Sequence, residues 1–143
     1  MAAPADLKPF VAFFEQLKPE DLPHLSRFYA ADTRFKDPFN EVVGVEAVAA
    51  IFRHMFDSLD EPRFVVRDLI VQGDQAFLSW DFLFRMRRFN RAGQCIRGGS
   101  HLRFGPDGLI TEHRDYWDAA EELYEKLPVV GGLMRWLKKK AAS

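Results

Sequence analysis

The sequence predicts an α+β domain in which an antiparallel sheet curls over helices. Two observations lead to this prediction. Apolar residues recur at helical spacing up to about residue 59, and they alternate as in strands after Pro62. Helices at both ends of the chain with a run of strands between them are typical of this class. The 143 residues show no repeat or linker, so we expect one domain over 1–143 with an amphipathic helix at about 130–141.

The first part of the chain predicts helices with one extended segment between them. Asp6 is a suitable N-cap for the first helix, and Pro23 fits the first turn of the second. Asp37 precedes Pro38, and a residue before proline avoids the helical conformation. The expected elements are helices at about 7–17, 21–31 and 45–59, and an extended segment at 33–39.

The second part of the chain predicts a meander of strands joined by glycine-containing turns, followed by a helix. The Gly98-Gly99 pair falls inside a strand, where it indicates a bulge or a close approach by a neighbouring group. The expected elements are strands at 63–71, 76–88, 95–104 and 109–117, and a helix at 118–127.

Alternation divides each strand into two faces, and the long strand at 76–88 is apolar on one of them. That face carries Trp80, Phe82 and Phe84, and the opposite face carries a carboxylate at Asp81. Neither face suits full solvation, so we expect one to pack on the helices and the other on a partner subunit. We assign the Trp80 face to the interface of a homodimer.

Composition excludes several classes of partner. Twenty basic residues nearly balance twenty-one acidic ones, which argues against nucleic acid and against an anionic membrane. Cys95 is the single cysteine, so no intramolecular disulfide forms, and we expect a buried strand cysteine. The N-terminus lacks the pattern of a secretory signal, and its apolar cluster is shorter than a membrane span. We therefore expect a cytoplasmic protein.

Residues 35–40, followed by Gly44 and the helix at 45–56, resemble the corresponding segment of ketosteroid isomerases and their SnoaL-like cyclase relatives in the nuclear transport factor 2 superfamily. The resemblance covers most of residues 6–118 and implies a cone-shaped fold with a pocket for a small apolar or polycyclic molecule. It implies a general base at Asp37. The oxyanion-hole positions of those isomerases fall on Phe13 and Arg97, and Phe13 has no donor.

Residues 113–118 are similar to a segment of limonene-type epoxide hydrolases. Those enzymes use an Asp-Arg-Asp set that activates water and protonates the epoxide. The resemblance implies that Asp115 and Asp81 match the two aspartates, whereas Ser79 stands where the arginine would be. Arg97 could replace that cation from the neighbouring strand.

Each candidate also has a structural interpretation. Asp37 before proline is a common turn former. Asp81 lies among large apolar residues, so it must be paired or protonated, either as a structural ion pair or as an acid or base. Asp115 shares a strand face with His113, within hydrogen-bonding reach, or it forms a salt bridge at the strand end. Aspartates and histidines could also hold a metal, but no tight ligand spacing supports one, and we predict none.

Together these observations predict an enzyme without a cofactor that uses carboxylate acid/base chemistry: an isomerase, a cyclase or an epoxide hydrolase. Asp37 or Asp81 would move a proton, Asp115 would hold His113, and Arg97 would stabilise negative charge. The alternative is a non-catalytic ligand-binding or protein-interaction module of the same fold. The residues expected to contact the ligand are Phe10, Phe13, Phe14, Phe39, Phe52, Phe56, Phe77, Ser79, His101 and Trp117.

Overall fold

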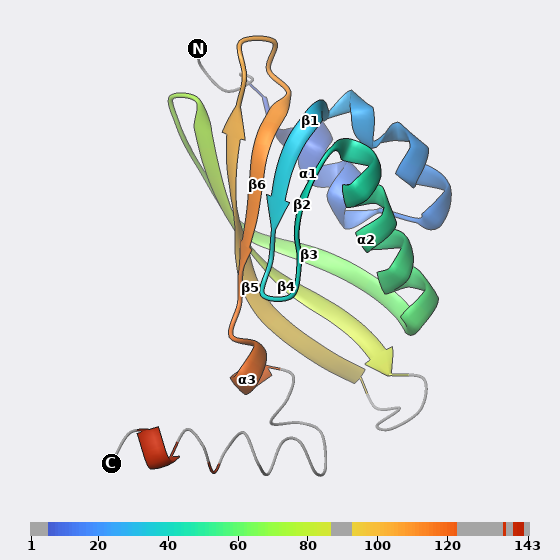
Figure 1. The fold of residues 1–143 in the computed structure, drawn as a ribbon, viewed down its shortest axis with the longest axis vertical. Coiled ribbons are helices and arrows are strands. Elements are labelled where there is room, and N and C mark those ends of the chain that lie inside the picture. The colour runs from blue at the N-terminus through green and yellow to red at the C-terminus, as the bar shows by residue number, and fades with distance from the viewer. Residues whose placement is uncertain (1–5, 87–92, 123–135, 137–138, 142–143) are drawn as a thin grey trace.

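A curved six-stranded sheet carries the N-terminal helices on one side (Figure 1). The computed structural model describes residues 6–86, 93–122, 136 and 139–141. The predicted helix at about 130–141 therefore lies largely outside the described residues, as does the end of the one at 118–127. The helical elements are α1 (Lys8–Glu15), the 3-10 helix η1 (Pro19–Arg27), α2 (Val45–Ser58) and α3 (Ala119–Glu122).

The strands are β1 (Tyr29–Lys36), β2 (Glu41–Val43), β3 (Leu59–Gln72), β4 (Gln75–Met86), β5 (Gly93–Phe104) and β6 (Ile110–Tyr116). Their order across the sheet is β2-β1-β6-β5-β4-β3. All neighbours are antiparallel except β1 and β6, which run parallel. The predicted α+β class is confirmed, but the expectation of a purely antiparallel sheet is wrong because β1 joins the meander beside its last strand.

The second predicted helix is the main error among the local elements. Residues 19–27 form a 3-10 helix, and the chain is already extended at Tyr29. Tyr29, Thr33 and Phe35 are buried, and pairing of β1 with β6 outweighs the helical spacing of the local sequence. Asp6 lies one residue before the N-cap position, which is Leu7, and its carboxylate accepts a hydrogen bond from the Lys8 N–H at 2.9 Å.

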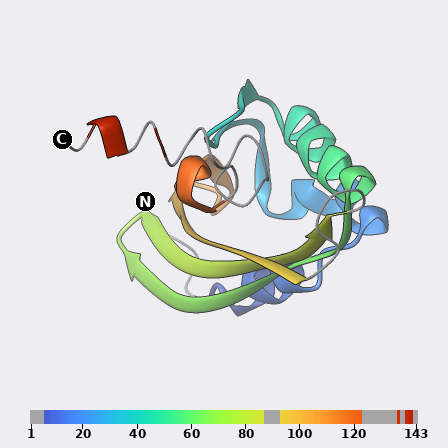
Figure 2. The ribbon, with the colours of Figure 1, turned by 90° about the horizontal axis from the view of Figure 1, so that it is seen from below.

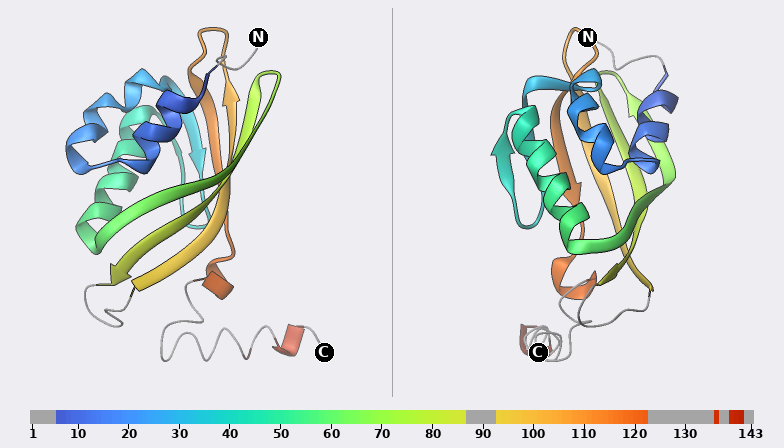
Figure 3. Two further views of the ribbon diagram at one scale, coloured as in Figure 1. Left: turned by 180° about the vertical axis from the view of Figure 1, so that it is seen from behind. Right: turned by 90° about the vertical axis from the view of Figure 1, so that its right-hand side faces the viewer.

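The sheet bends so that its concave face encloses the core. Figure 2 shows β3, β4 and β5 curving together, and both views in Figure 3 place α1, η1 and α2 on the same side of the sheet. From the helices, Phe10, Phe14 and Phe52 are buried in this core. At its lower part the sheet passes beneath the end of α2, so α2 and the bent strands face one another (Figure 1).

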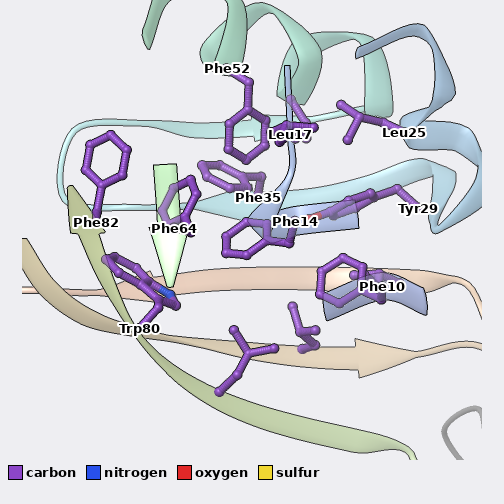
Figure 4. Packing of buried hydrophobic residues seen from close by; sticks show 14 of the residues in the cluster. Phe10, Phe14, Leu17, Leu25, Tyr29, Phe35, Phe52, Phe64, Trp80 and Phe82 are labelled. Carbon is purple, nitrogen blue, oxygen red and sulfur yellow. The ribbon is translucent and has the colours of Figure 1, made fainter. Parts of the chain in front are cut away.

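The faces of β4 are the reverse of the predicted assignment. Trp80, Phe82 and Phe84 are buried, and they point into the concave side with Phe64 and Phe52, as Figure 4 shows for all but Phe84. They cannot form an outer dimer face. Alternation correctly groups these residues, but both faces of β4 carry large apolar side chains, and alternation does not say which group lies inside.

The outer face of β4 carries the residues that were expected in the pocket. Phe77 is 40% exposed, and Asp81 forms an ion pair with Arg67 at 2.6 Å.

No helix among the described residues combines the length and the apolar character that crossing a membrane requires.

Candidate functional site

A cavity of about 310 Å³ lies between the end of α2 and the bent part of the sheet. Its volume is at the lower end of the roughly 300–1,000 Å³ typical of small-molecule sites. Asp37 and Asp115 line it. Apart from the indole nitrogens of the two tryptophans, the polar side-chain nitrogen atoms in the described lining belong to His54 and Asn40. The aromatic residues of its wall are Phe35, Phe39, Phe52, Phe64, Trp80, Phe82, Phe84 and Trp117.

Asp115 connects this cavity to a buried chain of hydrogen bonds. Its Oδ1 atom lies 2.6 Å from Nε2 of His113 and accepts a hydrogen bond from the Ser100 hydroxyl at 2.5 Å. On the far side of the imidazole, Nδ1 lies 2.7 Å from the Tyr29 hydroxyl oxygen. On the other branch, the Trp80 indole N–H donates to Ser100 Oγ at 2.9 Å. The predicted hydrogen bond between His113 and Asp115 is confirmed.

The partners in this chain fix the direction of each hydrogen bond. Tyr29 is fully buried, and burial, with a smaller contribution from the Asp115 charge, raises the pKa of its phenol well above the usual 10.0. The phenol therefore stays protonated, and the only hydrogen-bond acceptor that the described residues offer it is His113 Nδ1. Nε2 then carries the imidazole proton and donates to Asp115, whose Oδ1 atom also accepts from the Ser100 hydroxyl.

His113 itself is 1% exposed, and both of its ring nitrogens are occupied. It has no atom left for a ligand, whereas the Asp115 side chain is 13% exposed and lines the cavity. The Oδ2 atom of Asp115 has no hydrogen-bond partner among the described residues, so it is the oxygen available to a bound molecule. The arrangement is the reverse of the predicted one, because His113 holds Asp115.

Asp37 also lines the cavity and is held by its own turn. Its Oδ1 atom accepts the backbone N–H groups of Phe39 at 2.8 Å and Asn40 at 2.7 Å, and the Asn40 amide donates to both oxygens at 3.1 and 3.2 Å. Asp37 therefore both forms the turn and lines the cavity. The turn fixes a carboxylate at the place where Phe39 and Trp117 pack edge to face at 5.5 Å.

Gly98 in β5 makes room for the cavity wall. A Cβ atom at Gly98 would lie 2.6 Å from Cη2 of Trp80 and 2.9 Å from the backbone oxygen of Tyr116. A side chain at this position would therefore collide with the indole in the place from which it bonds to Ser100. The predicted close approach at Gly98 is confirmed.

The structure separates the remaining predicted residues from this cavity. Asp81 and Arg97 are cross-strand partners on the outer face, where Asp81 binds Arg67 and Arg97 lies 3.8 Å from Glu121. On the same face, Ser79 donates to Asp68 at 2.8 Å, and His101 lies 2.7 Å from Gln75. Phe77 pairs with His101 and shares that face. Asp81 and Asp115 therefore do not form one site in this chain.

Of the predicted aromatic contacts, Phe39, Phe52 and Trp117 line the cavity. Phe10 and Phe14 belong to the core beneath α1, and Phe13 packs on Phe28 with ring centroids 4.9 Å apart. Phe56 is half-buried against the core and is not among the residues that line the cavity. The helical spacing of these residues identifies buried positions, but it does not separate core from cavity.

Three residues of the hydrogen-bonded chain escaped the sequence analysis as site residues: Tyr29, Trp80 and Ser100. Ser100 and Trp80 are polar or amphipathic residues on otherwise apolar strand faces, which is the signal that could have revealed them. Tyr29 gives no such signal, because its contact with His113 depends on the parallel pairing of β1 with β6. Among the described residues, no group of three His, Cys, Asp or Glu side chains lies close enough to hold a metal ion.

Comparison with known proteins agrees with this fold. The sequence model of the SnoaL-like domain matches residues 10–113. The chain belongs to the SnoaL-like domain family. The match spans both the Asp37 turn and His113, and it ends two residues before Asp115. A search of functionally curated proteins finds no match.

Solved structures share the fold of this SnoaL-like protein at low sequence identity. A ketosteroid isomerase-like protein from Catenulispora acidiphila, in complex with trimethylamine, is 16% identical with a TM-score of 0.70, covering 85% of this chain and 91% of that one. An epoxide hydrolase of the LEH-like type from M. tuberculosis is 17% identical with a TM-score of 0.67, covering 93% and 95%. A Jannaschia protein described as a SnoaL-like polyketide cyclase is 14% identical with a TM-score of 0.68, covering 80% and 86%.

Proposed function

We propose that this protein is an enzyme without a cofactor that moves a proton on a small, mostly apolar molecule, with Asp115 as the general base. The observation that carries the proposal is the position of Asp115. It is the residue that joins the buried Tyr29–His113 pair to the cavity, and it leaves one carboxylate oxygen available there. Asp37 supplies a second carboxylate in the cavity lining.

The buried partners give Asp115 a defined position. Donors from His113 and Ser100 hold Oδ1, so the carboxylate need not reorganise when it accepts a proton. A base held in this way contributes about 100- to 10,000-fold to a proton transfer. In this proposal His113 is a positioning residue, and Tyr29 fixes its tautomer.

The charges around the cavity favour one of the predicted reaction types over the others. An isomerase or cyclase passes through an enolate and needs a donor or cation for its oxygen. Arg97, the residue expected to provide it, lies on the outer face, and no Lys or Arg is among the described residues that line the cavity. Epoxide opening develops positive charge on carbon, which the carboxylates and aromatic rings would stabilise. Asp115 would take a proton from water as the water oxygen attacks this carbon and the epoxide C–O bond breaks, and the released epoxide oxygen would take a proton from solvent. Hydrolysis of an apolar epoxide is therefore the reaction type we favour.

The test is a substrate panel with matched variants. Small apolar epoxides are assayed in ¹⁸O-labelled water, and ketones with acidic C–H bonds are assayed for deuterium exchange in heavy water. We expect labelled diol from the epoxides, with kcat/KM reduced about 100-fold or more in Asp115→Asn. Loss of activity in Asp81→Asn with retention in Asp115→Asn would overturn the assignment. Exchange on the ketones without diol formation would replace epoxide hydrolysis with the isomerase or cyclase type.

A non-catalytic binding module is the second candidate, and one observation favours it. Two hydrogen-bond donors of the cavity lining are already used within the protein. The Trp80 N–H donates to Ser100, and the Asn40 amide donates to Asp37. Ligand binding without turnover of any substrate in the panel, in the native chain and in Asp115→Asn alike, would support this candidate.

The predicted homodimer and cytoplasmic location stay part of this proposal. If the sheet mediates dimerisation, the contact must use its outer face, where Phe77 and its register partner Ile70 are 40% and 63% exposed. Large apolar side chains at such exposure are typical of interaction surfaces. Light scattering coupled to size exclusion would give a dimer mass for the native chain and a monomer mass for Phe77→Lys.

A further inference from the structure

The cavity combines aromatic walls with negative charge. Asp37 and Asp115 both line it, and so does Trp117, with Phe39 packed on it at 5.5 Å. Among the described lining residues there is no Lys or Arg, and the single titratable nitrogen belongs to His54. His54 is exposed and lies 3.5 Å from the Ser58 hydroxyl.

Among the described residues, neither carboxylate is paired with a Lys or Arg side chain. Asp37 accepts backbone N–H groups and the Asn40 amide, and Asp115 accepts the Ser100 hydroxyl and the Nε2–H of His113. Hydrogen bonds of this kind stabilise the charge of a carboxylate but do not neutralise it. A half-buried carboxylate beside apolar walls is costly unless a counter-charge is near.

The basic residues that precede the two aspartates in sequence are engaged outside the cavity. Lys36 and Arg114 line an adjacent hollow that Asp37 and Asp115 also line. Lys36 lies 3.6 Å from Glu41, and the Arg114 guanidinium lies over the Tyr116 ring at 4.7 Å. Among the described residues, no Lys or Arg side chain supplies a counter-charge on the cavity side, which leaves that role to a bound molecule.

From this arrangement we infer that the cavity selects small organic ammonium ions with apolar substituents. The faces of Trp and Phe rings attract such cations, and the attraction is strongest for tryptophan in a desolvated site. The carboxylates of Asp37 and Asp115 provide the charge, and rings such as Trp80 and Phe82 receive the substituents. This inference names the ligand class of the cavity used in the proposed function, and it rests on that proposal only for the choice of site.

The test compares three probes of similar shape by titration calorimetry on the full chain: phenyltrimethylammonium, the neutral isostere tert-butylbenzene and the anion benzenesulfonate. We expect the cation to bind at least roughly tenfold more tightly than the neutral probe, and the anion to bind most weakly. Equal or weaker binding of the cation would overturn the inference, as would failure of all three probes to bind. Because no turnover is measured, an inactive protein that prefers the cation would overturn the proposed function and leave this inference standing.

Variants assign the preference to the carboxylates. Asp115→Asn and Asp37→Asn should each reduce the cation's advantage over tert-butylbenzene several-fold while affinity for the neutral probe changes little. Asp68→Asn, an aspartate on the outer face that accepts from Ser79, is the matched control and should leave the ratio unchanged. If Asp115→Asn fails to fold, Asp37→Asn gives the answer alone, because its turn lies at the edge of the sheet. A cation preference that survives both cavity variants would overturn the role of the carboxylates.

Discussion

The hydroxyl of Tyr29 donates to Nδ1 of His113 across the parallel pair β1 and β6, with 2.7 Å between the two atoms. The rings stack with an interplanar angle of 10° and centroids 5.8 Å apart. Both side chains are fully buried, so no water replaces this hydrogen bond when it is lost. The pair fixes the orientation of the imidazole that in turn holds Asp115.

Replacing Tyr29 with phenylalanine should therefore be costly. Tyr29→Phe leaves Nδ1 of His113 buried without a donor, and an unsatisfied buried polar atom costs about 1–3 kcal/mol. We expect a loss of that size in the free energy of unfolding, measured with urea at neutral pH. Tyr116→Phe is the control, since the Tyr116 ring is 47% exposed, and it should change stability by less than about 0.5 kcal/mol. Equal effects of the two substitutions would contradict the buried hydrogen bond.

The same tyrosine predicts how stability depends on alkaline pH. Burial raises the pKa of Tyr29 above 10.0 in the folded chain, so the folded state keeps a proton that the unfolded state releases. Its contribution is present below pH 10 and is lost as the pH rises above that value, by up to about 1.4 kcal/mol per pH unit.

Urea unfolding between about pH 8 and about pH 11 checks this prediction. The free energy of unfolding of the native chain should fall more steeply above pH 10 than that of Tyr29→Phe. The comparison with the variant removes the contribution of lysines and other tyrosines. Parallel curves for the two proteins would show that Tyr29 titrates alike in both states.

The sequence analysis identified the fold class, most strands and α2 because their periodicity and turns are local properties. It also placed His113 and Asp115 on one face of a strand, which is a local property too. It failed where the outcome depends on distant partners. Residues 29–31 are helical by spacing but belong to β1, which pairs with β6 from Tyr29 onward.

The candidate site was only partly predictable for the same reason. Asp37 and Asp115 were identified through the two family resemblances and Trp117 from its place on the same strand face as Asp115, and all three line the cavity. Asp81 and Arg97 were misplaced because alternation gives two groups of residues without saying which group faces inward. Which of the two groups faces inward depends on how the side chains pack. Trp80 needs the space above Gly98, and only the concave side provides a ring of aromatic residues to pack against it.

Gly98 offers a test of that packing. Gly98→Ala places a methyl group where the Trp80 ring now lies, 2.6 Å from Cη2, so the indole must shift. Forcing an extra carbon into a packed position costs about 1–3 kcal/mol, and here it should also break the bond from Trp80 to Ser100. We expect lower stability and weaker binding of apolar probes in the cavity, measured by urea unfolding and calorimetry.

Gly93→Ala is the matched control, because a Cβ atom at Gly93 meets nothing within 4 Å. Its stability should equal or slightly exceed that of the native chain, as replacing an unconstrained glycine restricts the unfolded state. If both alanine variants behave alike, glycine at 98 is not needed for the position of Trp80.

The last prediction separates the two carboxylates that the epoxide hydrolase resemblance placed together. Asp81 binds Arg67 on the outer face, where the arginine side chain is 59% exposed and that of Asp81 is 22% exposed. A pair of this kind contributes less than about 1 kcal/mol. Asp81→Asn should therefore lower the free energy of unfolding by no more than that amount, Arg67→Gln should do the same, and the double variant should resemble either single one.

Binding of phenyltrimethylammonium should be unchanged in all of them, because Asp81 does not line the cavity. A loss of binding in Asp81→Asn but not in Asp115→Asn would move the site to the outer face of the sheet, beside Ser79 and Arg97.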